Sequence, residues 1–224
     1  MTVVFGPDTF TVSSDIGLAL YPSGSPTYAY NIGSGTNLTV NAANDRIQAV
    51  TTGSDWLARC THGSMPTGDQ EVTATVSTAA SGVDNSGNLA VRVATDNTAN
   101  GYNAYVNLGN TIWLYRIEPG PSFVSLGSTT RTFSTGAHTG RFRATGTNPV
   151  NLEYQLDALA VFTVSDSSAN RRTAGVPGVE FFCVGANTAF VDNFQVDDLV
   201  VAGAVTPQHT TFILGQALAR ASRY

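Results

Sequence analysis

Apolar and polar residues alternate with a period of two along much of the chain. In residues 150–156 every second side chain is large and apolar, while Asn151, Glu153 and Gln155 fall on the opposite face. This is the period of a strand with one buried face and one exposed face. The alternation predicts that the inward faces carry Phe142, Leu152, Tyr154, Phe181 and Phe194.

Strand-like runs of this kind recur about every 8 to 15 residues and are separated by Gly, Asn, Asp, Ser and Pro. The clearest are 70–78, 89–95, 102–108, 111–118, 122–126, 139–145, 150–156, 159–164, 179–184 and 190–201, and weaker ones are 10–12, 28–32, 37–40, 46–51 and 56–61. Roughly fourteen strands are more than one flat sheet usually carries before it splits into two packed layers. The sequence therefore predicts an all-β, two-layered antiparallel β-sandwich.

The length of 224 residues fits one large β domain. No internal repeat is evident, and the longest turn-rich stretch, 21–28, is short enough to be a surface loop. The one helix-forming stretch, 216–221, lies beyond the last predicted strand. We expect a sandwich domain over residues 1–202 and a short C-terminal arm over residues 203–224.

Charge excludes several classes of protein. Charged residues make up 12% of the chain, about half the usual ~25% share. All eleven basic residues are arginines, so P-loop, Schiff-base and lysine-base chemistry is excluded. The net charge is −5, and the only basic clusters are Arg141 with Arg143 and Arg171 with Arg172. This charge is too sparse for a nucleic-acid-binding surface.

Neither a basic, apolar leader nor an apolar run near the ~18 residues of a membrane span is found. We therefore expect synthesis in the cytoplasm and no membrane insertion. The two cysteines, Cys60 and Cys183, each share a strand face with apolar neighbours and belong to no CxxC motif. This pattern predicts two reduced, buried thiols.

No residue set has the spacing of a catalytic device. A glycosidase needs two carboxyl groups at a defined separation, and the one pair near a strand end, Glu153 and Asp157, lies on a polar outer face. His62, His138 and His209 have no ligand or triad motif around them. We expect no catalytic residues and no enzyme activity.

Two weaker patterns point to ligands. Asp84, Asn85 and Asn88 surround a glycine with the oxygen ligands that Ca²⁺ prefers, although a plain hairpin turn explains the same residues and no Glu closes the loop at Thr95. Calcium is the one cofactor that the sequence leaves open.

Sugar-binding sandwiches combine an aromatic platform with amide groups. Tyr102 alternates in phase with the apolar residues of its strand and is expected in the core, so Tyr105 is the better candidate for an exposed sugar contact. Ordinary packing is the alternative explanation for the same aromatic residues. The candidate glycan-binding residues are Tyr105, Asn103, Asn107, Trp113 and Tyr115.

Several segments together resemble the laminin-G or concanavalin A-like jelly-roll superfamily over about residues 5–201. They are 8–11, 101–107, 111–116, 140–146, 154–157, 162–167, 174–179 and 191–194. The resemblance implies a jelly-roll sandwich in a superfamily that includes lectins, glucanases, adhesins and virion proteins. Two departures stand out: Asp157-Ala158 replaces the usual Asp-Gly turn, and the Glu-x-Asp-x-x-Glu motif of the glucanases is missing.

Two functional hypotheses follow. The first is a non-enzymatic virion structural protein, a bacteriophage capsid decoration or fibre module, made in the host cytoplasm and docked on other virion subunits or on itself. Its arm would use Phe212, Ile213, Leu214, Leu218, Arg220 and Arg223. The alternative is a carbohydrate-binding or adhesion module of a bacterial protein, extracellular or at the cell surface, with a cell-surface glycan as its partner.

Overall fold

The computed structural model describes residues 2–11, 13, 16–18, 28–33, 38–49, 54–60, 68–78, 85–107, 110–120, 122–183 and 189–199. These residues form two antiparallel sheets, and none of them belongs to a helix that could cross a membrane. The all-β, two-layered antiparallel sandwich predicted from the alternation is therefore confirmed.

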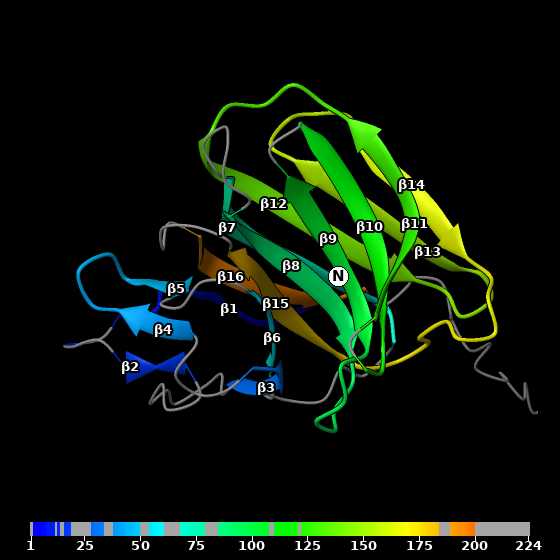
Figure 1. The fold of residues 1–224 in the computed structure, drawn as a ribbon, viewed down its shortest axis with the longest axis horizontal. Helices are drawn as coiled ribbons and strands as arrows, with labels where there is room; N and C mark the ends of the chain where they lie inside the picture. Colours follow the sequence, from blue (N-terminus) through cyan, green and yellow to red (C-terminus); the bar gives the residue numbers. More distant parts are fainter. Residues whose placement is uncertain are drawn as a thin grey trace, which may run out of the picture.

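The two sheets are assembled from strands that are distant in sequence (Figure 1). The nine-stranded sheet contains, in spatial order, β14 (Phe162–Asp166), β13 (Val150–Leu156), β12 (Gly136–Thr145), β7 (Gln70–Thr78), β16 (Phe190–Asp198), β5 (Arg46–Ala49), β4 (Leu38–Asn41) and β2 (Ile16–Gly17), with β1 (Thr2–Asp8) paired to β16. The seven-stranded sheet contains β11 (Ser122–Thr130), β10 (Thr111–Glu118), β9 (Gly101–Asn107), β8 (Asn85–Val93), β15 (Val176–Cys183), β6 (Ser54–Cys60) and β3 (Tyr28–Ile32). In Figure 1 the green strands β8 to β11 lie in front of β7, β12 and β13.

The core lies between the sheets, because each strand turns its apolar residues inward. The predicted core residues Phe142, Leu152, Tyr154, Phe181 and Phe194 are all fully buried or nearly so, which confirms the strand phases. Cys60 is a buried thiol, as predicted. The side chain of Cys183 lies outside the described residues, as do the arm over 203–224 and the helix expected at 216–221.

Several strand boundaries differ from the sequence prediction, and three of the differences affect whole segments. The first strand is β1, not 10–12, because Phe10 has a φ of 51° and its N–H donates to the Asp8 carboxylate in a local turn. Residues 85–88 belong to β8 and are not a hairpin turn. The edge strand β11 continues to Thr130 past a bulge at Leu126. In β8 and β11 polar residues concealed the strands from the sequence prediction: Ser86 and Asn88 are hydrogen-bonded to each other, and β11 lies at the edge of its sheet.

The turn after β13 closes without glycine. Asp157 has a φ of 49°, and its carboxylate accepts a hydrogen bond of 2.8 Å from the Thr139 N–H. Asp tolerates positive φ better than most residues because its short side chain bonds to nearby backbone. The Asp157-Ala158 sequence therefore serves where Asp-Gly would be expected.

Candidate functional site

Strands β9 and β10 carry aromatic side chains on the outer face of the seven-stranded sheet. Tyr102 is fully buried between the sheets, whereas Tyr105, with the opposite phase, is half-buried. In β10, Ile112 and Leu114 enter the core while Trp113 and Tyr115 face outward. The cross-strand pairing of Trp113 with Tyr105 then brings the outward residues together.

Five rings form a continuous surface, which we call the aromatic platform: Tyr105, Trp113, Tyr115, Phe123 and Phe182. The rings of Trp113 and Tyr115 are nearly parallel, with centroids 5.8 Å apart and an interplanar angle of 14°. The centroid of the Tyr105 ring lies 6.4 Å from that of Tyr115 and 5.7 Å from that of Phe182. All five side chains are half-buried, so part of each ring remains at the surface.

The sequence prediction included three of these five rings and missed Phe123 and Phe182. Phe182 belongs to β15, which is remote from β9 in sequence but separated from it in the sheet only by β8. The phase of Phe182, opposite to that of the buried Phe181, would have indicated that it faces outward. Its neighbours could not be predicted, because they depend on strand order.

A buried polar cluster lies on the same face of the sheet as the platform. The Asn88 side-chain amide donates to Glu180 Oε2 at 2.7 Å and to the Ser86 hydroxyl at 2.9 Å, and Asn103 donates to Glu180 Oε2 at 3.3 Å. Asn88, Asn103 and Glu180 are each at most 1% exposed. Asn103, predicted as a ligand contact, is thus covered, and its Oδ1 has no hydrogen-bond partner among the described residues.

The platform offers polar edges as well as ring faces. Neither the Trp113 indole N–H nor the Tyr115 hydroxyl makes a hydrogen bond within the described part of the chain. Burial raises the pKa of Tyr115, and the negative charge of Glu180 raises it further, so this hydroxyl is protonated near neutral pH. The side chain of Asn107, the remaining predicted contact, lies outside the described residues.

The calcium candidate is not assembled in the described residues. Asn88 lies within strand β8, and its side-chain amide donates hydrogen bonds to Glu180 and Ser86. Asp84 and the side chain of Asn85 lie outside the described residues. The described ranges contain no group of three or more His, Cys, Asp or Glu side chains that could hold a metal ion.

The two carboxyl groups considered for glycosidase chemistry have separate partners. Glu153 pairs with Arg143 at 3.4 Å, and Asp157 bonds His138 Nδ1 at 2.5 Å. The second nitrogen of His138 faces the Ser134 carbonyl at 2.9 Å. Both ring nitrogens of His138 therefore already have hydrogen-bond partners within the fold. A pocket of about 300 Å³ lies beside this residue.

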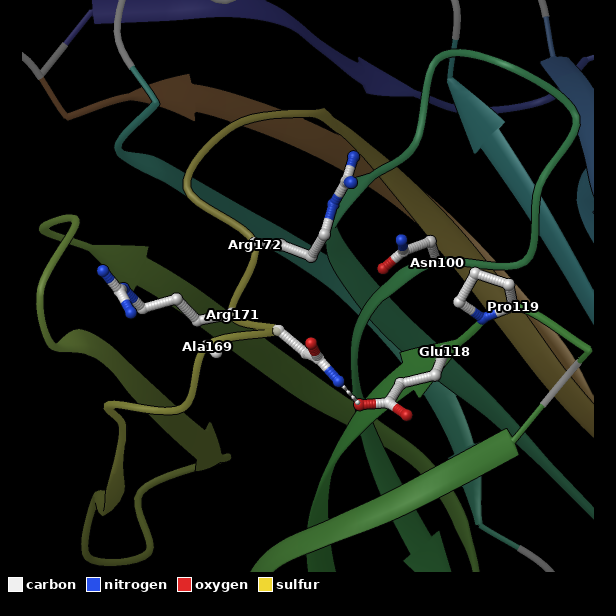
Figure 2. A pocket seen from close by; sticks show the side chains of 7 residues that line it. Asn100, Glu118, Pro119, Ala169, Arg171 and Arg172 are labelled. Atoms are coloured by element: carbon white, nitrogen blue, oxygen red, sulfur yellow. Dashed lines mark hydrogen bonds between the residues drawn. The ribbon is translucent and has the colours of Figure 1, made fainter.

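A second pocket, of about 390 Å³, lies where the loop before β15 meets the ends of β9 and β10 (Figure 2). It is lined by Asn100, Glu118, Pro119, Ala169, Asn170, Arg171 and Arg172. Under it, Arg116 donates to both oxygens of Asp166, at 3.0 and 2.9 Å, and the Tyr102 hydroxyl donates to Asp166 at 2.9 Å. These three residues are nearly inaccessible, so the pocket stands on a rigid base.

A scan of protein-family models gives no match, and a search of curated proteins gives none either. Solved structures do share its fold. The carbohydrate-binding module CBM66 from Bacillus subtilis is 17% identical with a TM-score of 0.53, over 75% of this chain and 91% of that one. An endo-1,3-beta-glucanase from Streptomyces sioyaensis is 12% identical with a TM-score of 0.52, over 87% and 95%.

The potassium-bound carbohydrate recognition domain of Emp46p is 10% identical with a TM-score of 0.56, over 87% of this chain and 97% of that one. At these identities the likeness concerns the fold. The chain thus has the sandwich fold found in carbohydrate-binding modules, lectin-like recognition domains and a glucanase.

Proposed function

We propose that this protein is a non-catalytic carbohydrate-binding module that binds a polysaccharide on the aromatic platform. The observation that carries the proposal is the outward grouping of Tyr105, Trp113, Tyr115, Phe123 and Phe182 on one sheet face. A sugar ring has an apolar face and a rim of hydroxyls, and amphipathic aromatic side chains complement both. The Trp113 N–H and the Tyr115 hydroxyl supply the polar contacts.

The cluster beneath the rings supports this function by holding them in place. Asn88 and Asn103 both donate to Glu180, and the Val106 N–H donates to Asn88 Oδ1 at 3.2 Å. Strands β8, β9 and β15 are thereby linked under the platform. A platform fixed before binding loses little conformational entropy when a ligand docks.

The fold relatives agree with this proposal, since two of those named above are a carbohydrate-binding module and a carbohydrate recognition domain. Catalysis has less support, because Glu153 and Asp157 are each engaged elsewhere. The virion role finds no support among these structures, and its arm lies outside the described residues. An extracellular or cell-surface location follows from the proposal.

The test is binding to a panel of soluble polysaccharides that includes a β-1,3-glucan and a mannan, measured by affinity electrophoresis and calorimetry. Trp113→Ala should weaken binding about tenfold or more, because a central aromatic contact is removed. Phe190→Ala is the matched control, since it deletes a half-buried ring from the other sheet. The proposal fails if no polysaccharide binds, or if Trp113→Ala binds as well as the control.

A further inference from the structure

The loop between β14 and β15 is anchored through the backbone of one residue, Arg172. Its N–H donates to the Tyr102 hydroxyl at 2.8 Å, and its carbonyl accepts from Arg92 Nη1 at 3.0 Å. Tyr102 and Arg92 are both fully buried. The Cα of Arg172 is therefore held on both sides by core residues, independently of what its side chain does.

The side chain of Arg172 makes no hydrogen bond to a described residue, which sets it apart from the other described arginines. Its charge acts only at longer range, on the exposed Asp96 carboxylate, whose pKa is lowered by hydrogen bonds from Thr98 and further by Arg172. Its Nε is buried and lacks a hydrogen-bond partner, and no described residue accepts a hydrogen bond from the rest of its guanidinium. Each of the others donates at least one side-chain hydrogen bond: Arg46, Arg59, Arg92, Arg116, Arg131, Arg141, Arg143 and Arg171. An arginine held by its backbone and unsatisfied at its head group is suited to an anionic ligand.

The opposite wall of the pocket is acidic. Glu118 Oε1 accepts from Arg116 at 2.7 Å and from Asn170 at 3.2 Å, whereas Oε2 accepts no hydrogen bond from a described residue. In Figure 2, the side chain of Arg172 extends upward past Asn100 with its guanidinium turned away from Glu118, Arg171 extends away from the pocket, and Glu118 lies on the lower side. The pocket lining thus combines an arginine that has no hydrogen-bond acceptor among the described residues with a carboxylate oxygen that can accept from a hydroxyl.

These two groups restrict the chemistry of the ligand. A guanidinium binds a carboxylate through two parallel hydrogen bonds, while a carboxylate such as Glu118 accepts from hydroxyls and repels a nearby anion. Inorganic phosphate would meet that repulsion with only one or two hydroxyls to donate, whereas a sugar acid carries several hydroxyls at a distance from its carboxylate. A volume of about 390 Å³ lies within the range of small-molecule sites.

We propose that this pocket binds a monosaccharide-sized hydroxy-carboxylate, such as a hexuronate, with its carboxylate on Arg172 and its hydroxyls toward Glu118. Asn100 and Asn170 line the pocket beside them. This site is separate from the aromatic platform, so it stands or falls independently of polysaccharide binding there.

The experiment uses free glucuronate, glucose and inorganic phosphate as probes of the full chain, followed by amide chemical shifts and calorimetry at low salt. Glucuronate should bind with shifts at Asn100, Glu118 and residues 169–172, and Arg172→Gln should weaken it at least tenfold. Arg172→Lys keeps the positive charge but cannot form two parallel hydrogen bonds to a carboxylate, so its affinity for glucuronate should lie between those of the wild type and Arg172→Gln. Arg141→Gln, on the other sheet, should bind like the wild type.

Thermal melts check that the variants are folded, which is expected because the Arg172 side chain makes no hydrogen bond to described residues. Equal binding of glucuronate by wild type and Arg172→Gln would overturn the assignment. Phosphate or glucose binding as tightly as glucuronate would overturn the ligand class. Trp113→Ala should keep glucuronate binding, which separates a failure here from a failure of the platform.

Discussion

At the scale of single residues, buried charge holds the proposed pocket in place. Asp166 is 3% exposed and accepts from Arg116, Tyr102 and the Ser168 N–H. Burial works to raise the pKa of Asp166, but hydrogen bonds from Ser168, Arg116 and Tyr102 outweigh it and hold the pKa below its usual value. The carboxylate therefore stabilises the folded state in its charged form.

Asp166→Asn should lower the free energy of unfolding by about 1 to 3 kcal/mol, because the buried Arg116 loses the more deeply buried of its two charged partners and keeps only Glu118. The folded pKa of Asp166 lies below the unfolded value of about 4, so its contribution is full above that pH and is lost as the pH falls through the folded pKa. Urea denaturation from pH 7 to pH 2 measures both effects. The stability of Asp166→Asn should not show the loss that protonation of Asp166 causes in the wild type as the pH falls. Glu153→Gln is the control, and because Glu153 is half-exposed its replacement should change stability little.

Residue-scale prediction succeeds where a side chain's position depends on its own strand. Tyr102 and Tyr105 could be assigned to opposite faces from alternation alone, and the structure agrees. The burial of Asn103 could not be predicted, because it depends on Glu180, a residue 77 positions away. Likewise, only tertiary structure reveals that Arg172 alone among the described arginines lacks a side-chain acceptor.

At the scale of elements, the loop that carries Arg172 is fixed by its junction with β15. Gly175 has a φ of +148°, and a Cβ at this position would lie 2.4 Å from the Arg92 carbonyl carbon and 2.5 Å from its oxygen. The backbone of the loop thus packs directly against β8. Only glycine permits both this approach and this dihedral angle.

Gly175→Ala should destabilise the protein by more than the ~1 to 3 kcal/mol that a strained dihedral angle costs, because a steric clash is added. Gly136→Ala is the matched control: Gly136 also has a positive φ, +125°, but a Cβ added there would meet nothing within 4 Å. Chemical denaturation of both variants separates the cost of the strained dihedral angle from the cost of the steric clash. Equal losses of stability would show that the contact with Arg92 relaxes without cost.

Element boundaries were predictable where apolar alternation is complete. The ranges 70–78, 111–118 and 150–156 match β7, β10 and β13 at both ends. Strand β8 begins four residues earlier than expected, because Ser86 and Asn88 have the composition of a turn. Their hydrogen bonds with each other and with Glu180 explain why a strand tolerates them.

At the scale of the whole molecule, the apolar residues of both sheets form one main core cluster, which extends from Phe10 to Val196. The two-layered architecture could be predicted from the number of strands. The order of the strands could not, because β7 lies between β12 and β16, which follow it by more than fifty residues. Local alternation carries no information about such distant partners.

A chain ending at residue 202 should unfold in one thermal transition at the temperature of the full chain, because the deletion removes no part of the described core. Circular dichroism and calorimetry measure the transition. Two transitions would contradict the prediction of one domain over residues 1–202. A loss of several kcal/mol would instead place residues 203–224 in the folded domain and remove the basis for an arm.

Adjacent residues of strand β10 point to opposite faces of the sheet and have different roles. Tyr115 lies on the aromatic platform, and Arg116, on the other face, forms hydrogen bonds with Asp166. Substitution at 113 or 115 can therefore vary the ligand while the residues that maintain the fold stay unchanged. Insertion of one residue into β10 would move each of the following side chains to the opposite face of the sheet, so both the platform and the contact with Asp166 would be lost. Evolution of ligand preference in this protein should thus proceed by replacement at alternate positions of a β10 of constant length.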